Sequence, residues 1–284
     1  MIPSRFVRQV LLVLCMCVIA ASVFAQATTG EYEPRVGQEG KDVVWVPTPQ
    51  ALVDKMLDVA KVTPQDFVID LGSGDGRTVI TAAKRGARAL GIEYNPEMVE
   101  VSKRNAAREG VADKAQFIQG DLFESDFSQA TIITMFLLEE INLKLRPRIL
   151  DLKPGTRIVS NYFTMGAWAA DEIVTVEKQE ECQVYCTAYF WIVPAKVEGR
   201  WMLPQGELTL EQSFQMISGT LKSGANTTPV TNGKLSGDLI TFSVGDITYT
   251  GRVNGSSMDG TYTTKWNATQ VKEALQAPAQ KPNL

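Results

Sequence analysis

The hydrophobic positions follow different periods in the two halves of the chain. Between residues 43 and 194, short β-branched apolar runs alternate with stretches whose apolar residues recur every three or four positions, which indicates strands alternating with amphipathic helices. We expect strands at 67–71, 88–93, 115–119, 130–136, 156–161, 173–176 and 184–193, and helices at 78–85, 96–109 and 139–152. This alternation predicts an α/β fold with a doubly wound parallel sheet and helices on both faces.

A further helix is expected before the first strand, after a short extended segment at 43–49. Thr48 is the predicted N-cap and Pro49 the first helical residue, because proline is favoured there. The apolar face of this helix would carry Leu52, Val53, Met56, Leu57 and Ala60.

From residue 196 to 267 the helical period gives way to period-two runs divided by glycines, which predicts an antiparallel meander. The runs lie at 207–210, 213–221, 237–244, 246–253 and 258–262, and glycines recur at 233, 237, 251, 255 and 260 as in small open barrels and lipocalin-like sheets. We expect a small sheet or half-barrel that packs on the first domain. The tail at 268–284 is expected to be disordered.

The beginning of the chain has the pattern of an export signal. Arg5 and Arg8 precede an apolar run over residues 10–25 that ends in Val-Phe-Ala, with small residues at the positions a signal peptidase inspects. We expect residues 1–25 to be a signal peptide and 26–42 a flexible leader. Left uncleaved, the signal would be the protein's contact with the membrane. Either outcome predicts a periplasmic or secreted protein.

Composition limits the partners. With 284 residues and 44% hydrophobic composition, the chain suffices for one or two domains. A net charge of −4 argues against nucleic acid, since proteins that bind phosphate backbones usually carry a basic surplus. The densest basic cluster, Lys144, Arg146 and Arg148, is more typical of a solvated helix face.

The segment from Asp70 to Arg77 predicts a ligand site. An apolar strand ends there in an acid and continues into Gly72, Gly74 and Gly76. Glycine can adopt positive φ and lets the backbone approach a ligand, while the helix that follows presents free N–H groups. A second strand ends in Glu93, an acid suited to ribose hydroxyls. The spacing departs from the G-x-G-x-x-G pattern of dinucleotide loops, because position 77 is arginine.

This spacing resembles motif I of the class I S-adenosylmethionine-dependent methyltransferases, D/E-x-G-x-G-x-G. The resemblance implies a Rossmann-like seven-stranded sheet with an antiparallel edge, and S-adenosylmethionine as cofactor. Asp70 with the backbone of Gly72, Ser73 and Gly74 would hold its methionine part, and Glu93 its ribose. Asp121 and Leu122, after the strand at 115–119, would face the adenine. Asp121 alone is also a plausible helix N-cap.

Residues 45–194 further resemble the small lysine methyltransferases that modify the adenine nucleotide translocase and the ATP synthase c-subunit. The shared elements are Val-Pro-Thr-Pro at 46–49, Asp-Leu-Gly-Ser-Gly-Asp-Gly-Arg at 70–77 and Gly-Ile-Glu-Tyr-Asn-Pro at 91–96. This resemblance implies N-methylation of a protein lysine or another amine. The signal and the C-terminal β region depart from that family.

The acceptor side is expected after the fourth strand, at Phe136, Glu139 and Glu140. One glutamate would accept a hydrogen bond from an entering ammonium, with Phe136, Trp45 and Tyr162 as apolar or cation–π walls. The alternative is a helix-start acid pair beside ordinary core aromatics. Histidine is absent from the chain, so no histidine base or ligand exists and no metal is expected. The absence of Asp-Pro-Pro-Tyr disfavours base amino groups as acceptors.

Cys182 and Cys186 remain in the mature chain, and an oxidising compartment favours a disulfide. On one extended strand, however, residues four apart lie about 13 Å from each other, beyond the roughly 7 Å limit for a bridge. Two small buried residues are therefore favoured, unless Cys182 lies in a turn.

Three functions stay open: an exported methyltransferase for a protein lysine or other amine, a methyltransferase for a small molecule or envelope component with the β domain as a lid, and a non-enzymatic binding module. The non-enzymatic module stays open because S-adenosylmethionine is made in the cytoplasm, and an exported enzyme has no evident supply of it.

Overall fold

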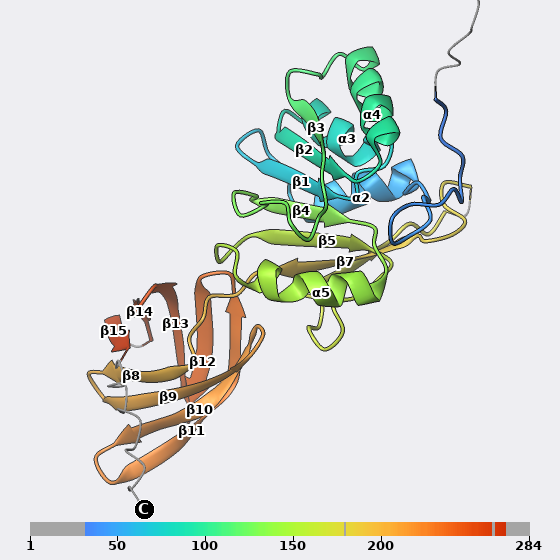
Figure 1. The fold of residues 1–284 in the computed structure, drawn as a ribbon. Helices are drawn as coiled ribbons and strands as arrows, with labels where there is room; N and C mark the ends of the chain where they lie inside the picture. Colours follow the sequence, from blue (N-terminus) through green and yellow to red (C-terminus); the bar gives the residue numbers. More distant parts are fainter. Residues whose placement is uncertain (1–31, 179, 263–264, 271–284) are drawn as a thin grey trace, which may run out of the picture. The chain divides into compact units, whose positions relative to one another are not determined.

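The computed structural model describes residues 32–178, 180–262 and 265–270 (Figure 1). The predicted signal peptide lies outside these residues. Along the chain the described part contains α/β elements first and antiparallel strands afterwards, as the two hydrophobic periods predict.

The first seven strands form one sheet in the order β3-β2-β1-β4-β5-β7-β6. Strands β1 to β5 are parallel to one another, whereas β7 is antiparallel to both β5 and β6. Their bounds are β1 Phe67–Leu71, β2 Arg88–Glu93, β3 Ala115–Gln119, β4 Ile132–Met135, β5 Arg157–Asn161, β6 Glu172–Thr175 and β7 Thr187–Ile192. The strand order reverses direction between β1 and β4, where open α/β sheets bind ligands.

Helices flank this sheet, and its strands alternate side chains between two buried clusters. Val68 belongs to one cluster and Ile69 to the other, as the two-residue strand period requires. Residues of α2, α3 and α4 contribute to the cluster of Val68, and those of α5 to the cluster of Ile69. The helices are α2 Gln50–Val59, α3 Arg77–Lys84, α4 Pro96–Arg108 and α5 Glu139–Leu150. The Rossmann-like sheet is therefore confirmed.

Helix α2 buries the predicted apolar residues, including Leu52 and Met56, but its N-cap prediction was wrong by one residue. Pro49 is the N-cap, and no side chain caps the helix. The Thr48 hydroxyl instead accepts a hydrogen bond from Asn161 Nδ2 at 3.2 Å, from the end of β5. The Thr48 side chain, which the local sequence predicts as a helix cap, therefore takes part in a tertiary hydrogen bond instead.

The C-terminal strands form a closed antiparallel barrel in the order β10-β11-β12-β13-β14-β15-β8-β9. They are β8 Gly199–Leu203, β9 Gly206–Ser213, β10 Met216–Ser223, β11 Asn226–Ser236, β12 Leu239–Val244, β13 Ile247–Asn254, β14 Ser257–Thr261 and β15 Lys265–Gln270. The expected half-barrel was wrong, because pairing of β15 with β8 closes the sheet. Residues 268–270 belong to β15, so the predicted start of the disordered tail was also wrong.

Strand β11 was not predicted from the sequence, because Pro229 and Gly233 interrupt the alternation of apolar and polar residues. Its register with β10 shifts between Ile217 and Gly219, and its register with β12 shifts between Thr231 and Lys234. A Cβ on Gly233 would lie 2.3 Å from the Ile217 carbonyl oxygen, so glycine permits this close approach. Bulges of this kind bend strands and help sheets to close.

Residues 34–48, here called the N-terminal segment, follow a defined path. Gly37 N–H donates to the Trp45 carbonyl at 2.8 Å, and Trp45 N–H donates to the Gln38 carbonyl at 2.9 Å. The predicted flexible leader therefore does not describe residues 37–42. These residues lack an apolar period, but Gln38 N–H donates to the Arg35 carbonyl and Gly40 N–H to the Val43 carbonyl, both at 3.0 Å. Among the described residues, no helix has the length and apolar character needed to cross a membrane.

Candidate functional site

A cavity of about 430 Å³ opens at the carboxyl ends of β1, β2 and β4. This volume lies within the range of small-molecule sites. Its lining comes from the N-terminal segment, the glycine loop after β1, the ends of β2 and β4, and two loops that carry Phe163 and Tyr185. All seven predicted cofactor residues contribute to it: Asp70, Gly72, Ser73, Gly74, Glu93, Asp121 and Leu122. The structure therefore brings the three predicted motifs to one cavity.

The glycine loop has the backbone that its sequence predicted, with φ of 76° at Gly72, 54° at Gly74 and 82° at Gly76. A Cβ on Gly74 would stand 2.5 Å from Trp45 Nε1, so a side chain there collides with the N-terminal segment. Ser102 Oγ donates to the Gly74 carbonyl at 2.7 Å. The loop is thus held by a hydrogen bond from Ser102 of α4 and by packing of Gly74 against the Trp45 indole.

Glu93 connects the end of β2 to this loop. One carboxylate oxygen accepts from Gly74 N–H at 2.9 Å, and the other accepts from Asn95 N–H at 3.0 Å. Asn95 in turn caps α4 by accepting from Glu97 N–H at 2.9 Å. Glu93 therefore both lines the cavity and fixes the glycine loop relative to α4.

Asp70 lies at the floor of the cavity and is 6% exposed. Its Oδ1 accepts a hydrogen bond from Thr134 Oγ1 at 2.6 Å, which favours the ionised carboxylate. Burial outweighs this bond and raises the pKa of Asp70 to about 7, and the negative charges of Glu93 and Asp75 add to the effect. A cationic ligand group placed beside this carboxyl would stabilise its ionised form.

Ser73 and its neighbouring glycines bear on the fit for a polar ligand. Its hydroxyl is buried and makes no hydrogen bond in the structure, although buried polar groups nearly always have a partner. It belongs to the cavity lining beside the positive-φ glycines. The hydroxyl itself lies over Gly91, where an added Cβ would stand 2.5 Å from Ser73 Oγ. The glycine backbone and the buried carboxyl of Asp70 fit a compact zwitterionic group such as an amino acid.

Asp121 follows β3 and makes two different contacts. Its Oδ1 accepts from Phe123 N–H at 2.9 Å within a turn, and no helix begins there, so the helix N-cap alternative was wrong. Its Oδ2 pairs with Lys41 Nζ at 2.5 Å. The Lys41 hydrogen bond is the main cause that lowers the pKa of Asp121, with the Phe123 bond next. Arg148 donates to the Leu122 and Phe123 carbonyls at 3.2 and 2.6 Å and so supports this turn from α5.

The N-terminal segment was underestimated by the sequence analysis, which assigned a site role to Trp45 alone. Lys41 also lines the cavity, with Nζ 4.9 Å from the ring centroid of Tyr94. Arg77 joins two predicted motifs, because its Nη1 donates to the Thr48 carbonyl at 2.9 Å while its guanidinium pairs with Asp75. The shared Val-Pro-Thr-Pro and glycine-loop elements are thus in direct contact.

The other end of the cavity is aromatic. Phe136, after β4, lines it as predicted, together with Phe163 and Tyr185, which the sequence analysis did not identify. Tyr162 was predicted as a wall but is not among the residues that line the cavity. It is 49% exposed, and its ring contacts those of Phe163 and Tyr185. Asn142 of α5 positions the loop by donating to the Phe163 and Thr164 carbonyls, both at 3.2 Å.

Glu139 does not line this cavity, contrary to the sequence prediction. Its carboxylate is exposed and accepts a hydrogen bond from Thr164 Oγ1 at 2.5 Å. Glu139 and Glu140 occupy the first turn of α5, where acids interact favourably with the helix dipole. The helix-start alternative therefore describes them. Among the described residues, no cluster of three or more His, Cys, Asp and Glu side chains is suited to a metal ion.

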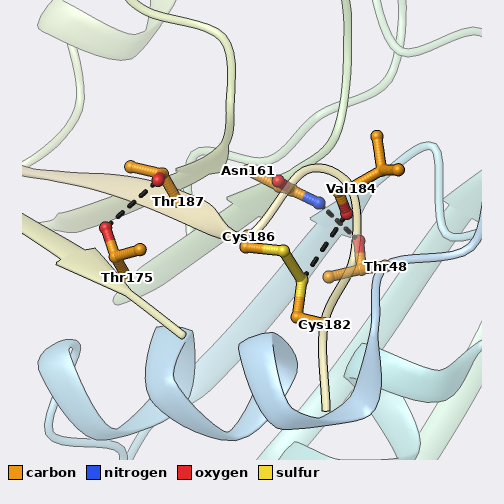
Figure 2. The surroundings of a disulfide bond; sticks show 7 residues. All are labelled: Thr48, Asn161, Thr175, Cys182, Val184, Cys186 and Thr187. Carbon is orange, nitrogen blue, oxygen red and sulfur yellow. Dashed lines mark hydrogen bonds between the residues drawn. A yellow bond between two sulfur atoms is a disulfide. The ribbon is translucent and has the colours of Figure 1, made fainter. Parts of the chain in front are cut away.

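Cys182 and Cys186 form a disulfide with a Cα–Cα distance of 5.7 Å (Figure 2). The favoured expectation of two separate buried cysteines was wrong because the strand begins at Thr187 rather than at residue 184. Cys182 lies in a turn, with its N–H donating to the Lys178 carbonyl at 3.1 Å. Extended geometry, which would have kept the two residues apart, does not apply there.

Comparison with known proteins matches residues 70–172 to the ANTKMT methyltransferase domain. A protein-lysine N-methyltransferase of Saccharolobus islandicus is 42% identical over 154 residues, which cover 53% of this chain and 94% of that protein. The human lysine N-methyltransferase of the ATP synthase c-subunit is 37% identical over 107 residues, which cover 37% of this chain and 46% of that protein.

One solved structure extends the comparison. A protein from Salinibacter ruber, described as an RNA methyltransferase in complex with S-adenosyl-L-homocysteine, is 47% identical with a TM-score of 0.50, and the match covers 54% of this chain and 96% of that one. The chain spans nearly the whole of the archaeal and Salinibacter proteins but about half of the human enzyme. These relatives differ in the acceptor that their names state, which is protein lysine in two and RNA in the third.

Proposed function

The chain belongs to the protein-lysine N-methyltransferase family of S-adenosylmethionine-dependent methyltransferases, and on this premise we propose that it methylates the side-chain amine of a lysine in a protein. The observation that carries this proposal is a single cavity with two chemically different ends. The glycine loop, Asp70, Glu93 and Asp121 provide a polar end for the cofactor. Phe136, Phe163 and Tyr185 provide an apolar end suited to the four-carbon stem of lysine.

We assign the cofactor contacts residue by residue. Asp70 faces the ammonium of the methionine part, with Ser73 Oγ and the backbone of Gly72 and Gly74 as neighbouring polar groups. Glu93 faces the ribose hydroxyls. Asp121 and Leu122 face the adenine. The buried carboxyl of Asp70 and the positive-φ backbone of Gly72 and Gly74, all of which line the cavity, support the first of these assignments.

The cofactor supplies a methyl group on a positively charged sulfur, which is already activated for transfer. The lysine ammonium would first release one proton to solvent, so that its nitrogen has a free lone pair to accept the methyl group. In the proposed reaction this lone pair forms the N–C bond, and the C–S electron pair returns to sulfur. The nitrogen would release a second proton after the transfer. The chain's residues need to hold the amine in line and to exclude water, which contributes most of the catalysis in such transfers. A histidine base is not required, in keeping with the absence of histidine.

The acceptor is proposed to be a protein rather than RNA, although one relative is described as an RNA methyltransferase. The net charge is −4. Two of the three clustered basic residues are engaged within the fold: Arg146 donates to the Met165 carbonyl at 2.7 Å, and Arg148 donates to the turn after Asp121. A phosphate backbone favours free, clustered cations.

The test is methyl transfer from labelled S-adenosylmethionine in parallel reactions with lysine-containing envelope proteins, free small amines and total RNA. We expect label in protein, located on lysine by mass spectrometry, and loss of this label after reductive dimethylation of the acceptor lysines. Label in RNA or in the small amine alone would refute the lysine assignment. Tight S-adenosylhomocysteine binding without transfer to any acceptor would favour the non-enzymatic module.

We also propose that the protein is exported by residues 1–25. The basic and apolar pattern of that segment supports this, as does the disulfide, since disulfides persist chiefly in oxidising compartments. Fusion of residues 1–45 to a periplasm-dependent reporter tests it, with Arg5 and Arg8 retained and residues 10–25 deleted as the control. A reporter that is equally active with and without the apolar run would contradict export by this segment.

A further inference from the structure

Tyr185 connects the aromatic end of the cavity to the disulfide. It lines the cavity and directly precedes Cys186 in the loop that the Cys182–Cys186 bridge closes. Its φ is 57°, in the left-handed region that a bulky side chain rarely adopts. Strained backbone of this kind persists where surrounding contacts determine it. Contacts with neighbouring residues must therefore stabilise the left-handed backbone conformation of Tyr185.

The sequence itself favours a different backbone for this loop. The alternating apolar pattern from Val184 to Ile192 predicts a strand that includes Tyr185. If this extended geometry continued back to Cys182, Cys182 and Cys186 would lie about 13 Å apart. The disulfide holds their Cα atoms at 5.7 Å. The bridge thus excludes the extended alternative, and with it the position that Tyr185 would take on a longer β7.

Both ends of the loop are attached to the sheet domain. Val176 N–H donates to the Cys186 carbonyl at 2.9 Å, and buried Cys182 belongs to the same core cluster as Leu52 and Val53 of α2. Figure 2 shows the bridge close to α2, with Asn161 and Thr48 beside it. Because β7 is antiparallel to β5, its first residue lies at the cavity edge of the sheet. Tyr185, two residues before β7, therefore lies at the mouth of the cavity.

At that mouth Tyr185 completes a group of four rings from three segments. Its centroid lies 5.2 Å from Phe136 and 5.0 Å from Tyr162, with edge-to-face planes at 63° and 82°. Phe163 lies 6.5 Å away. Aromatic ring faces attract an ammonium within about 6 Å, and apolar walls accommodate its methylene stem.

We infer that Tyr185, held by the Cys182–Cys186 disulfide, is an acceptor-binding residue for a primary alkyl ammonium, so that the acceptor subsite is complete in the oxidised protein. This rests on the proposed amine methylation. Reduction by a phosphine or thiol transfers two electrons to the bridge and leaves two thiols, which frees the loop to extend. The contacts described for Asp70, Ser73, Glu93 and Asp121 come from outside residues 182–186, so cofactor binding is expected to survive reduction.

The experiment measures two affinities on the same protein. Calorimetry gives S-adenosylhomocysteine binding, and titration of the S-adenosylhomocysteine-loaded protein with n-butylamine, followed by NMR, gives binding of the lysine side-chain mimic. The variants are Tyr185→Ala, Tyr185→Phe and the double variant Cys182→Ala/Cys186→Ala. Val184→Ala, a 61% exposed position in the same loop, is the matched control. Wild type is measured before and after reduction.

We expect reduction, the double cysteine variant and Tyr185→Ala each to weaken n-butylamine binding about tenfold, with S-adenosylhomocysteine affinity within about twofold of wild type. Tyr185→Phe and Val184→Ala should bind the amine as wild type does, and Tyr185→Ala should be insensitive to reductant. With a lysine peptide as acceptor, the same changes should raise KM and leave kcat nearly unchanged, a split that a general loss of stability does not produce.

Three results would overturn the inference. The first is unchanged amine binding in Tyr185→Ala or in the reduced protein. The second is parallel loss of S-adenosylhomocysteine binding, which would make the bridge a general brace of the fold. The third is a wild type that does not bind the amine. If wild type binds the amine in a disulfide-dependent manner but transfers no methyl group to lysine, the inference stands and the proposed function fails.

Discussion

The two ends of the cavity are built in different ways. The polar end is formed where parallel strands stop: Asp70 and Glu93 lie at the carboxyl ends of β1 and β2, and Asp121 comes two residues after β3. The aromatic end brings together Phe136 after β4, Phe163 after β5 and Tyr185 before the antiparallel β7. The first end is encoded by local motifs, whereas the second depends on strand order and on a covalent bridge.

This difference predicts that the two ends respond separately to mutation. Changes at the polar end should abolish cofactor binding and with it all activity. Changes at the aromatic end should affect the acceptor and leave cofactor affinity intact.

The largest effect is expected from Gly74→Arg. A Cβ at this position would meet the Trp45 indole at 2.5 Å, and φ is 54°, so the substitution displaces the loop or Trp45 and fills the polar end. We expect S-adenosylhomocysteine affinity to fall more than about a hundredfold, measured by calorimetry, with the circular dichroism spectrum retained. Binding within tenfold of wild type would remove the site assignment.

Glu93→Ala should have the next largest effect, because two backbone N–H groups, of Gly74 and Asn95, lose their acceptor. Loss of charge-assisted bonds of this kind costs about 1.5–3 kcal/mol each, and we expect about thirtyfold weaker S-adenosylhomocysteine binding. Glu93→Gln is the matched control, since it keeps one oxygen acceptor. If Gln and Ala were equally weak, charge rather than loop support would be the role of Glu93.

Phe136→Ala tests the aromatic end. The variant removes a ring that contacts both Phe163 and Tyr185, so we expect the KM for a lysine peptide to rise about tenfold. S-adenosylhomocysteine affinity should stay within about twofold of wild type. Phe136→Leu keeps apolar volume without a π face and separates the two contributions. An equal loss of cofactor affinity would contradict the separation of the two ends.

The raised pKa of Asp70, at the polar end, makes the stability of the protein depend on pH. Its folded pKa of about 7 lies above the ordinary value of 3.8, so the folded protein binds a proton more tightly than the unfolded chain does. The ligand-free protein should therefore lose stability as pH rises from about 4 to about 7, by up to about 4 kcal/mol. Urea unfolding at pH 5 and pH 8 measures this, and Asp70→Asn should reduce the difference.

Cofactor affinity should change with pH in the opposite direction. A ligand ammonium beside Asp70 favours the ionised carboxyl, so S-adenosylhomocysteine binding should weaken several-fold between pH 8 and pH 6. Calorimetry in buffers of different ionisation enthalpy should detect proton release near pH 6. Affinity that is independent of pH in wild type, or equally dependent in Asp70→Asn, would place the ammonium elsewhere.

Sequence patterns predicted the sheet domain closely, with β1, β2 and β3 matching at both ends. They succeeded because buried parallel strands are continuous apolar runs and glycine loops mark their ends. They failed at Glu139, where an acid near the expected acceptor side contacts Thr164, and at the cysteines, where strand propensity was given more weight than turn geometry. They also failed at β11, because Pro229 and Gly233 conceal a strand that bulges to close the barrel.

The sequence by itself determined the α/β fold and the polar end of the site, because Asp70, the three glycines, Glu93 and Asp121 are each fixed by their own strand and the turn after it. Tertiary structure decided the rest. Lys41, Phe163 and Tyr185 reach the cavity through long-range pairing of the N-terminal segment, the end of β5 and the disulfide loop. Contacts between segments distant in sequence leave no local period, so they emerge when the strands have taken their order in the sheet.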